Sequence, residues 1–290
     1  MGLPLNAETW TALAALLIPR LLPALGATTL LGLLALLRGS VSGSGALGGL
    51  MVGTLFWLGG DWSAWLLLAT FFITSSLIGI PAKKLRPSIE SKHQRGGRRS
   101  WHQVLANTGP MLLVAGALPF AEVDSTNPGL FWVLKVALVA GFAAAAADTW
   151  AGEVGVLSRK PPRLLWGLTA VEPGQSGGVT WRGTLGGAAG AVALALVGLT
   201  SGLGWTGVII AATWGFASSL VDSLLGATVQ ALYQQPDGQW TEKPVNSQGR
   251  DNTLVRGWAW MNNDLVNLIS VALAVMGALV TAFFLLFLVL

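Results

Sequence analysis

The stretch "AAAAADTWAGEVG", residues 143–155, runs as an apolar helix and then places Asp148 and Glu153 within a turn and a half. A membrane-spanning helix needs about 20 mostly apolar residues, and residues 130–149 satisfy this requirement. A charged Asp at the centre of a span costs about 2.5–3.5 kcal/mol, so carboxylates are easier to place where a span ends. The stretch therefore predicts a membrane helix with an acidic site at its mouth.

The rest of the chain agrees with a membrane protein. Of its 290 residues, 53% are hydrophobic and only 10% are charged, with a mean hydropathy of +0.63, whereas soluble domains carry about 25% charged residues. We expect an all-α, polytopic membrane helix bundle of seven or eight transmembrane helices, with residues 1–290 forming a single integral membrane domain. The candidate spans lie near residues 10–37, 45–60, 62–80, 104–120, 130–149, 183–200, 206–226 and 265–289.

The basic residues predict the orientation of the bundle. Apart from Arg20 and Lys135, every Lys and Arg lies at Arg38 or in the loops 81–103, 151–182 and 227–264. These segments fall on one side if every span crosses, and the positive-inside rule makes that side cytoplasmic. The polar clusters lie at the same span ends, so we expect an active site on the cytoplasmic side.

Four acidic residues at these span ends are candidate ligands for Mg²⁺ or catalytic groups. Besides Asp148 and Glu153, Asp222 lies in a polar stripe that includes Ser219, and Asp264 begins the last span. Mg²⁺ prefers one or two carboxylates together with substrate phosphates. We expect Asp148, Asp222 and Asp264 to be metal ligands and Asp148, Glu153 and Asp222 to be catalytic; which carboxylate binds metal and which acts as a base stays open.

A second group of residues is suited to phosphate. Arg98 and Arg99 precede a helix, where backbone N–H groups and the helix dipole favour anions, and guanidinium groups bind phosphates bidentately. A glycine-rich segment, "EPGQSGGVTWRGT" at 172–184, can offer backbone N–H groups in the same way. The predicted nucleotide- and phosphate-binding residues are Arg98, Arg99, Asn107, Gly174, Ser176, Gly177, Gly178, Arg182, Ser219, Asn263 and Asn267.

Carboxylates, arginines and a glycine loop on one membrane face are the parts that phosphoryl transfer needs, because this chemistry depends on positioning and charge stabilisation. The absence of cysteine and the presence of only two histidines exclude a thiolate nucleophile and a zinc-type histidine cluster. We expect a nucleotide, a lipid phosphate and membrane lipids as partners, and no nucleic acid.

Five segments together resemble the integral-membrane phytyl-phosphate kinase family of tocopherol biosynthesis and phytol salvage. They are "GGRRSWHQVLANTGP" (96–110), "AADTWAGEVG" (146–155), "VEPGQSGGVTWRGT" (171–184), "SSLVDSLLGATVQ" (218–230) and "NNDLVNLIS" (262–270). The resemblance covers roughly residues 30 to 285, with the motifs in the family's order. More distantly, the chain is similar to dolichol and phytol kinases that use CTP.

The resemblance implies transfer of a phosphate from a nucleoside triphosphate, with CTP favoured over ATP or UTP, to a prenyl monophosphate. A phosphate monoester is largely dianionic at neutral pH, so it is a nucleophile without a strong general base. Two alternatives stay open at this point: a CTP-dependent cytidylyltransferase that acts on a lipid phosphate, and a transporter of lipid phosphate or small ions.

Overall fold

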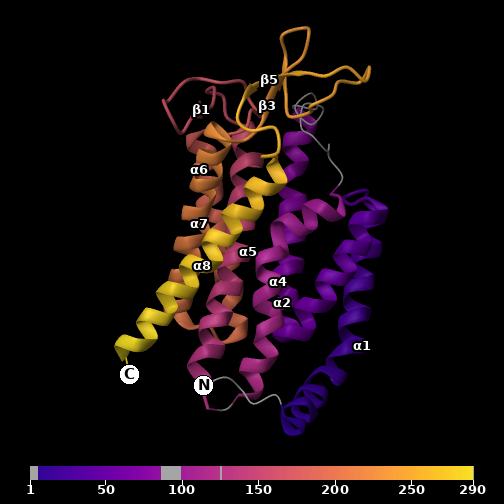
Figure 1. The fold of residues 1–290 in the computed structure, drawn as a ribbon, viewed down its shortest axis with the longest axis vertical. Helices are drawn as coiled ribbons and strands as arrows, with labels where there is room; N and C mark the ends of the chain where they lie inside the picture. Colours follow the sequence, from indigo (N-terminus) through magenta and orange to yellow (C-terminus); the bar gives the residue numbers. More distant parts are fainter. Residues whose placement is uncertain (1–5, 86–98, 125, 290) are drawn as a thin grey trace.

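The structure is a bundle of long helices with a lobe of loops and short strands at one end (Figure 1). The computed structural model describes residues 6–85, 99–124 and 126–289. The helices are α1 (Ala7–Leu37), α2 (Gly43–Leu85), α4 (Trp101–Val123), α5 (Pro128–Val156), α6 (Trp181–Val197), the 3₁₀ helix η1 (Gly198–Ser201), α7 (Gly204–Thr228) and α8 (Asn263–Val289).

Within the described residues, seven helices are long and apolar enough to cross a membrane, which confirms the predicted all-α membrane bundle. Helix α2 is bent at Gly60 and Asp61, where Asp61 adopts a φ of 59°. Its two arms then fold back on each other, because a Cβ added at Gly53 would lie 3.3 Å from Leu68 Cδ2. In a straight helix these two residues would be about 22 Å apart. The hairpin explains why the sequence allowed either seven or eight spans.

The connecting segments with most of the basic residues lie together at one end of the bundle (Figure 1). They include two antiparallel sheets: β1 (Arg163–Leu164) with β2 (Gly178–Val179), and β3 (Leu232–Gln234) between β4 (Trp240–Thr241) and β5 (Thr253–Arg256). We call this end the lobe end. The arrangement agrees with the alternation of spans that the charge pattern predicts.

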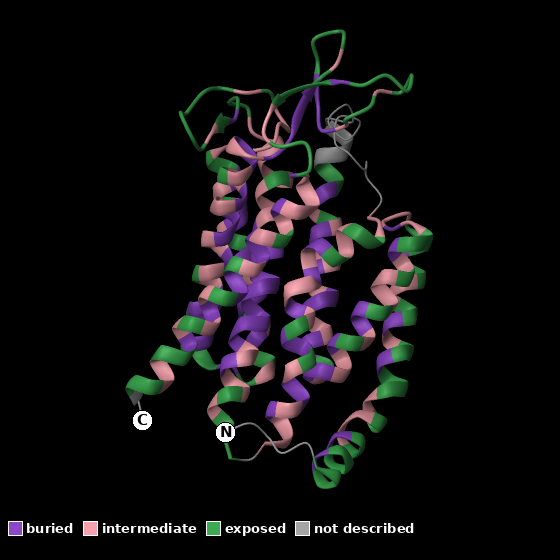
Figure 2. Ribbon diagram, viewed as in Figure 1, coloured by how far each residue is buried: buried purple, intermediate pink, exposed green. Residues whose placement is uncertain are grey.

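Helix α5 is the centre of the bundle. Its residues from Val136 to Ala147 are all buried, and α5 packs against α2, α4, α6, α7 and α8. Figure 2 shows the buried residues gathered along α5 and the helix faces turned toward it, whereas α1 is largely exposed. In a membrane such packing depends on close contact between helices, because lipid tails are as apolar as the side chains.

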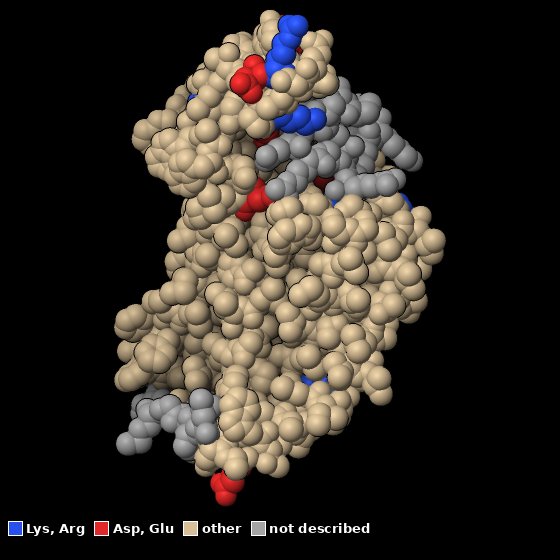
Figure 3. Space-filling model, turned by 45° about the vertical axis from the view of Figure 1, so that its right-hand side comes forward, with Lys and Arg blue, Asp and Glu red and all other residues tan. Residues whose placement is uncertain are grey.

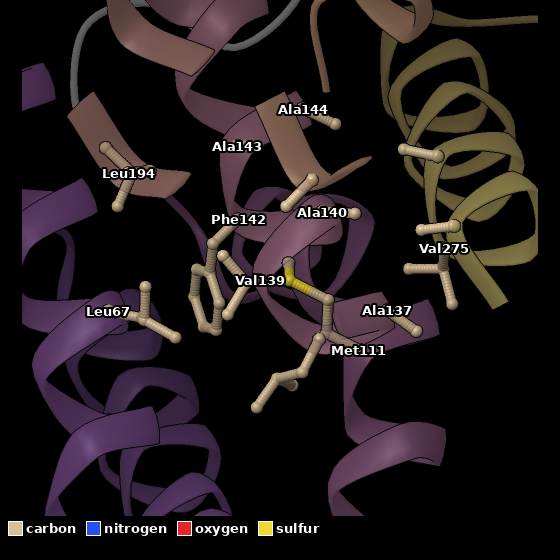
Figure 4. Packing of buried hydrophobic residues seen from close by; sticks show 14 of the residues in the cluster. Leu67, Met111, Ala137, Val139, Ala140, Phe142, Ala143, Ala144, Leu194 and Val275 are labelled. Atoms are coloured by element: carbon tan, nitrogen blue, oxygen red, sulfur yellow. The ribbon is translucent and has the colours of Figure 1, made fainter. Parts of the chain in front are cut away.

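Small residues let the neighbouring helices approach α5 closely. A Cβ added at Gly190 of α6 would lie 2.9 Å from the Ala146 carbonyl oxygen, and one at Gly215 of α7 would lie 2.6 Å from Ala143 Cβ. Larger side chains fill the other sides: Figure 4 shows Phe142 turned toward Leu67 of α2. The alanine run of α5 is therefore a packing surface for glycines.

The two basic residues outside the loops have specific partners at the far end of the bundle. Arg20 of α1 pairs with Glu122 at 2.6 Å and donates a hydrogen bond to the Leu58 carbonyl oxygen. Lys135 of α5 donates to the Ser201 carbonyl oxygen at 2.9 Å. A charge near a membrane interface is tolerated when it is paired in this way.

We expect Gly215→Leu to lower the stability of the bundle, because the added side chain meets the α5 backbone, including the Ala143 carbonyl carbon at 2.9 Å from the new Cβ. Overpacking of this kind costs about 1–3 kcal/mol. Thermal unfolding of the detergent-solubilised protein measures the loss. Gly116→Leu is the control, since a Cβ there meets no atom of the described residues within 4 Å; equal stability of the two variants would contradict the packing argument.

Candidate active site

A cavity of about 450 Å³ lies where the bundle meets the lobe end. Its walls come from α2, α4, α5, the start of α6, α7 and α8, and the segments around β2 and β4 contribute its cover. The structure brings most of the predicted site residues together here: Asp148, Glu153, Asp222, Asp264, Arg99, Asn107, Gly174, Ser176, Gly177, Gly178, Ser219, Asn263 and Asn267. Figure 3 shows charged side chains gathered at this end and an almost uncharged band below it.

The acidic centre of the cavity is a pair of carboxyl groups from two helices. Asp148, on the last turns of α5, interacts with Asp222 of α7 through their side chains. Asp222 is 9% exposed, and its Oδ2 atom is buried with no hydrogen-bond partner among the described residues. A buried carboxylate oxygen without a partner is costly unless a cation or a donor completes it.

This pair fits a magnesium ion. Within the described residues, no group of three or more His, Cys, Asp and Glu side chains is arranged to hold a metal alone. Mg²⁺ does not need such a group, because it keeps several waters and takes one or two carboxylates plus substrate phosphates. The Asp148–Asp222 pair matches that requirement, and Asp264 lines the same cavity at the start of α8.

Arg99 provides a positive charge in the same cavity, near Glu153. Its guanidinium group lies over the rings of Phe71 and Phe72, with its Cζ atom 5.4 and 5.5 Å from the ring centroids. Burial lowers the pKa of Arg99, and the nearby charge of Glu153 opposes this shift. An arginine nevertheless stays protonated at neutral pH, so the cavity contains a fixed cation as well as acids.

Of the two other predicted arginines, the structure describes only Arg182. Arg182, predicted to bind phosphate, is exposed and does not line the cavity. Its Nη1 atom donates a hydrogen bond of 3.4 Å to the Leu157 carbonyl oxygen. Arg182 lies two residues after Thr180, which caps α6 and does line the cavity. Arg98 lies outside the described residues.

The loop 174–178 closes over the end of α7. Gly174 and Gly177 have positive φ values of 85° and 80°, and a Cβ at Gly177 would collide with the Ala227 backbone nitrogen. Only glycine permits both this conformation and this approach. Arg256 of β5 fixes the loop by donating hydrogen bonds to the Ser176 carbonyl oxygen at 3.0 Å and the Gly226 carbonyl oxygen at 2.7 Å.

Glu242, which the sequence did not single out, joins this loop to the lobe. The Ser176 hydroxyl donates to Glu242 Oε1, and Gln230 Nε2 donates to both Ser176 Oγ and Glu242 Oε1 at 3.1 Å. Glu242 also lines the cavity. Glu242 directly follows β4 and Arg256 ends β5, and no local sequence pattern signals how these strands pair.

The structure is that of a multi-pass membrane protein whose cavity, at one end of the bundle, combines paired carboxyl groups, an arginine and a glycine loop. The chain matches the family described as "Integral membrane protein DUF92" over residues 26–275. It belongs to this family of integral membrane proteins. No solved structure matches the chain.

Three relatives illustrate the family. Protein PGR of Arabidopsis thaliana is 30% identical over 81% of this chain and 87% of its own length. Protein VTE6, chloroplastic, of the same plant is 26% identical over 82% of this chain and 64% of its own. An uncharacterised membrane protein of Methanocaldococcus jannaschii is 34% identical over 56% and 63%. These relatives confirm the resemblance to the phytyl-phosphate kinase family.

We expect Arg256→Met to loosen the loop 174–178, because it removes both hydrogen bonds that the guanidinium group donates. Hydrogen bonds from a charged group contribute about 1.5–3 kcal/mol, so amide exchange in the loop should accelerate about tenfold or more. Hydrogen–deuterium exchange followed by mass spectrometry measures this, with the exposed Arg250→Met as the control. Unchanged exchange in the loop would show that Arg256 does not fix it.

Proposed function

We propose that the protein is a Mg²⁺-dependent kinase that transfers a phosphate from a nucleoside triphosphate, with CTP the expected donor, to a prenyl monophosphate. The observation that carries this proposal is the Asp148–Asp222 pair, with its unpartnered oxygen, in the same cavity as Arg99 and the glycine loop. The relationship to VTE6, a phytyl-phosphate kinase, supports a prenyl phosphate as the acceptor.

Each group has a role in this proposal. Asp148 and Asp222 would hold the metal, with Asp264 beside them, and Mg²⁺ when bound neutralises charge on the phosphates. Arg99 and the amide groups of Asn107 and Asn263 bind phosphate oxygens. The backbone N–H groups of the glycine loop bind the nucleotide phosphates.

The chemistry needs little beyond this positioning. An oxygen of the acceptor phosphate attacks the γ-phosphorus, the bond from that phosphorus to the bridging β-oxygen breaks, and a nucleoside diphosphate leaves. The acceptor is largely dianionic at neutral pH because its second pKa is about 6, so no strong base has to remove a proton. The pairing of carboxylates with a fixed arginine suits this reaction, in which charge moves between phosphates.

The cytoplasmic side is the proposed location of the cavity. Arg38 and most other basic residues of the chain lie in the segments at the lobe end, and basic loops are retained in the cytoplasm. A site there meets soluble nucleotide and, in the adjacent leaflet, a lipid phosphate.

The direct test is the fate of labelled nucleotide with purified protein and phytyl phosphate. We expect label from the γ-phosphate of CTP to appear in a prenyl diphosphate product. Asp148→Asn should reduce this transfer roughly 10²–10³-fold, since it removes a charge that organises the reacting phosphates. Asp124→Asn, at the far end of the bundle, should retain the wild-type rate.

Other results would indicate a different activity. Label from the α-phosphate of CTP in the lipid product would indicate a cytidylyltransferase. Flux of lipid phosphate across liposomes, without binding or turnover of any nucleotide, would indicate a transporter. Full activity of Asp148→Asn would refute the assigned role of this residue.

Metal dependence tests the acidic pair separately. Chelation should abolish transfer, and added Mg²⁺ should restore it. In Asp222→Asn the half-saturating Mg²⁺ concentration should rise about tenfold or more, the range typical when a metal site loses a supporting group. Asp237→Asn, in an exposed turn of the lobe, is the control. A lower rate with an unchanged Mg²⁺ requirement would remove Asp222 from the metal site.

A further inference from the structure

A second depression, which we call the apolar groove, lies beside the polar cavity between α1, the two arms of α2, and α4. Its walls are almost entirely apolar and include Leu31, Gly32, Gly49, Leu68, Phe72 and Val104. The groove begins at the lobe end and runs into the depth of the membrane-spanning helices, because Thr28 and Leu68 lie well inside their helices.

The groove and the polar cavity adjoin each other. Arg99, Gln103 and Asn107 line both of them. Arg99 marks the boundary. Its guanidinium group lies over the rings of Phe71 and Phe72, which line the groove, and its charge interacts with Glu153, which lines the polar cavity. A ligand with a charged head and an apolar tail could therefore occupy both parts at once.

The free space in the groove is local. A Cβ added at Gly32 of α1 or at Gly49 of α2 would meet no atom of the described residues within 4 Å. On the same arm of α2, a Cβ at Gly45 would collide with the Arg99 carbonyl oxygen, and one at Gly53 would lie 2.5 Å from Thr28 Cγ2. Gly45 and Gly53 thus allow close contact between the chain segments, whereas Gly32 and Gly49 border free space in the groove.

The groove also has access to lipid. Helix α1, one of its walls, has only 17% of its most apolar window buried inside the structure. Leu22 and Leu37 on this helix are 80% and 84% exposed, so α1 presents most of its surface to the bilayer. A hydrocarbon chain can reach the groove beside this helix without passing through water.

We propose that the apolar groove holds the hydrocarbon chain of the acceptor lipid, with the acceptor's phosphate at Arg99 in the polar cavity. This inference rests on the proposed function. It gives the two substrates separate entrances: the nucleotide enters from the lobe end, and the lipid enters sideways from the bilayer. Because a lipid tail gains little by moving from bilayer to an apolar groove, the groove contributes position and chain selectivity rather than affinity.

Filling the groove tests this. Gly32→Phe and Gly49→Phe place a ring in the open channel, whereas Gly26→Phe puts the same ring on an exposed position of α1 that also has free space around it. Transfer is measured with a long-chain acceptor, phytyl phosphate, and a short one, dimethylallyl phosphate. The ratio of kcat/KM for the long over the short acceptor should fall about tenfold or more in the groove variants, the discrimination expected of an apolar pocket, and stay at the wild-type value in Gly26→Phe.

The outcomes separate this inference from the proposed function. An unchanged ratio in both groove variants overturns the groove assignment while the kinase stands. If the wild-type protein transfers phosphate to neither acceptor, the proposed function fails, and a binding experiment then decides about the groove. A phytyl phosphate analogue with a photoreactive tail should label α1 and α2, and excess phytyl phosphate should compete with it. Labelling elsewhere, or equal labelling by a photoreactive phosphatidylcholine, overturns the inference, the second because an ordinary bilayer lipid then fills the groove.

Discussion

The close approach of helices to α5 is the constraint on which the rest of the structure depends. Glycines of α6 and α7 lie directly against its alanine run, so the helices reach a distance that larger side chains would forbid. At the lobe end the same closeness places Asp222 of α7 against Asp148 of α5. The same close helix contacts therefore pack the apolar middle of the bundle and, nearer the lobe end, bring the two carboxyl groups together.

The charged side chains at the two ends of the bundle are arranged in different ways. At the far end, Arg20 and Glu122 neutralise each other. At the lobe end, the carboxyl groups of Asp148 and Asp222 contact each other, with Arg99 in the same cavity. Two buried carboxyl groups held together are costly to ionise unless a cation or a ligand completes the site. The structure therefore stabilises one end internally and leaves the other dependent on what it binds.

Much of this could be predicted from the sequence because membrane spans and their charged flanks are local patterns. The stretch around Asp148 and the polar stripe around Asp222 each predicted a helix that carries an acidic side chain toward a site, and both residues line the cavity. The bend of α2 at Gly60 and Asp61 lies where the sequence divided the candidate spans 45–60 and 62–80. Arg182 is near the glycine loop in sequence but does not line the cavity, and Glu242 was missed because strand pairing brings it to Ser176 from 66 residues away.

The place of α8 in the chain has a consequence for biosynthesis. Its first turns supply Asn263, Asp264 and Asn267, and they come after every other wall of the cavity in the sequence. A ribosome-bound chain would insert α1 to α7 with the cavity still lacking one side. The cavity would then be complete only when the last helix enters the bilayer, so an unfinished chain would lack one of its walls.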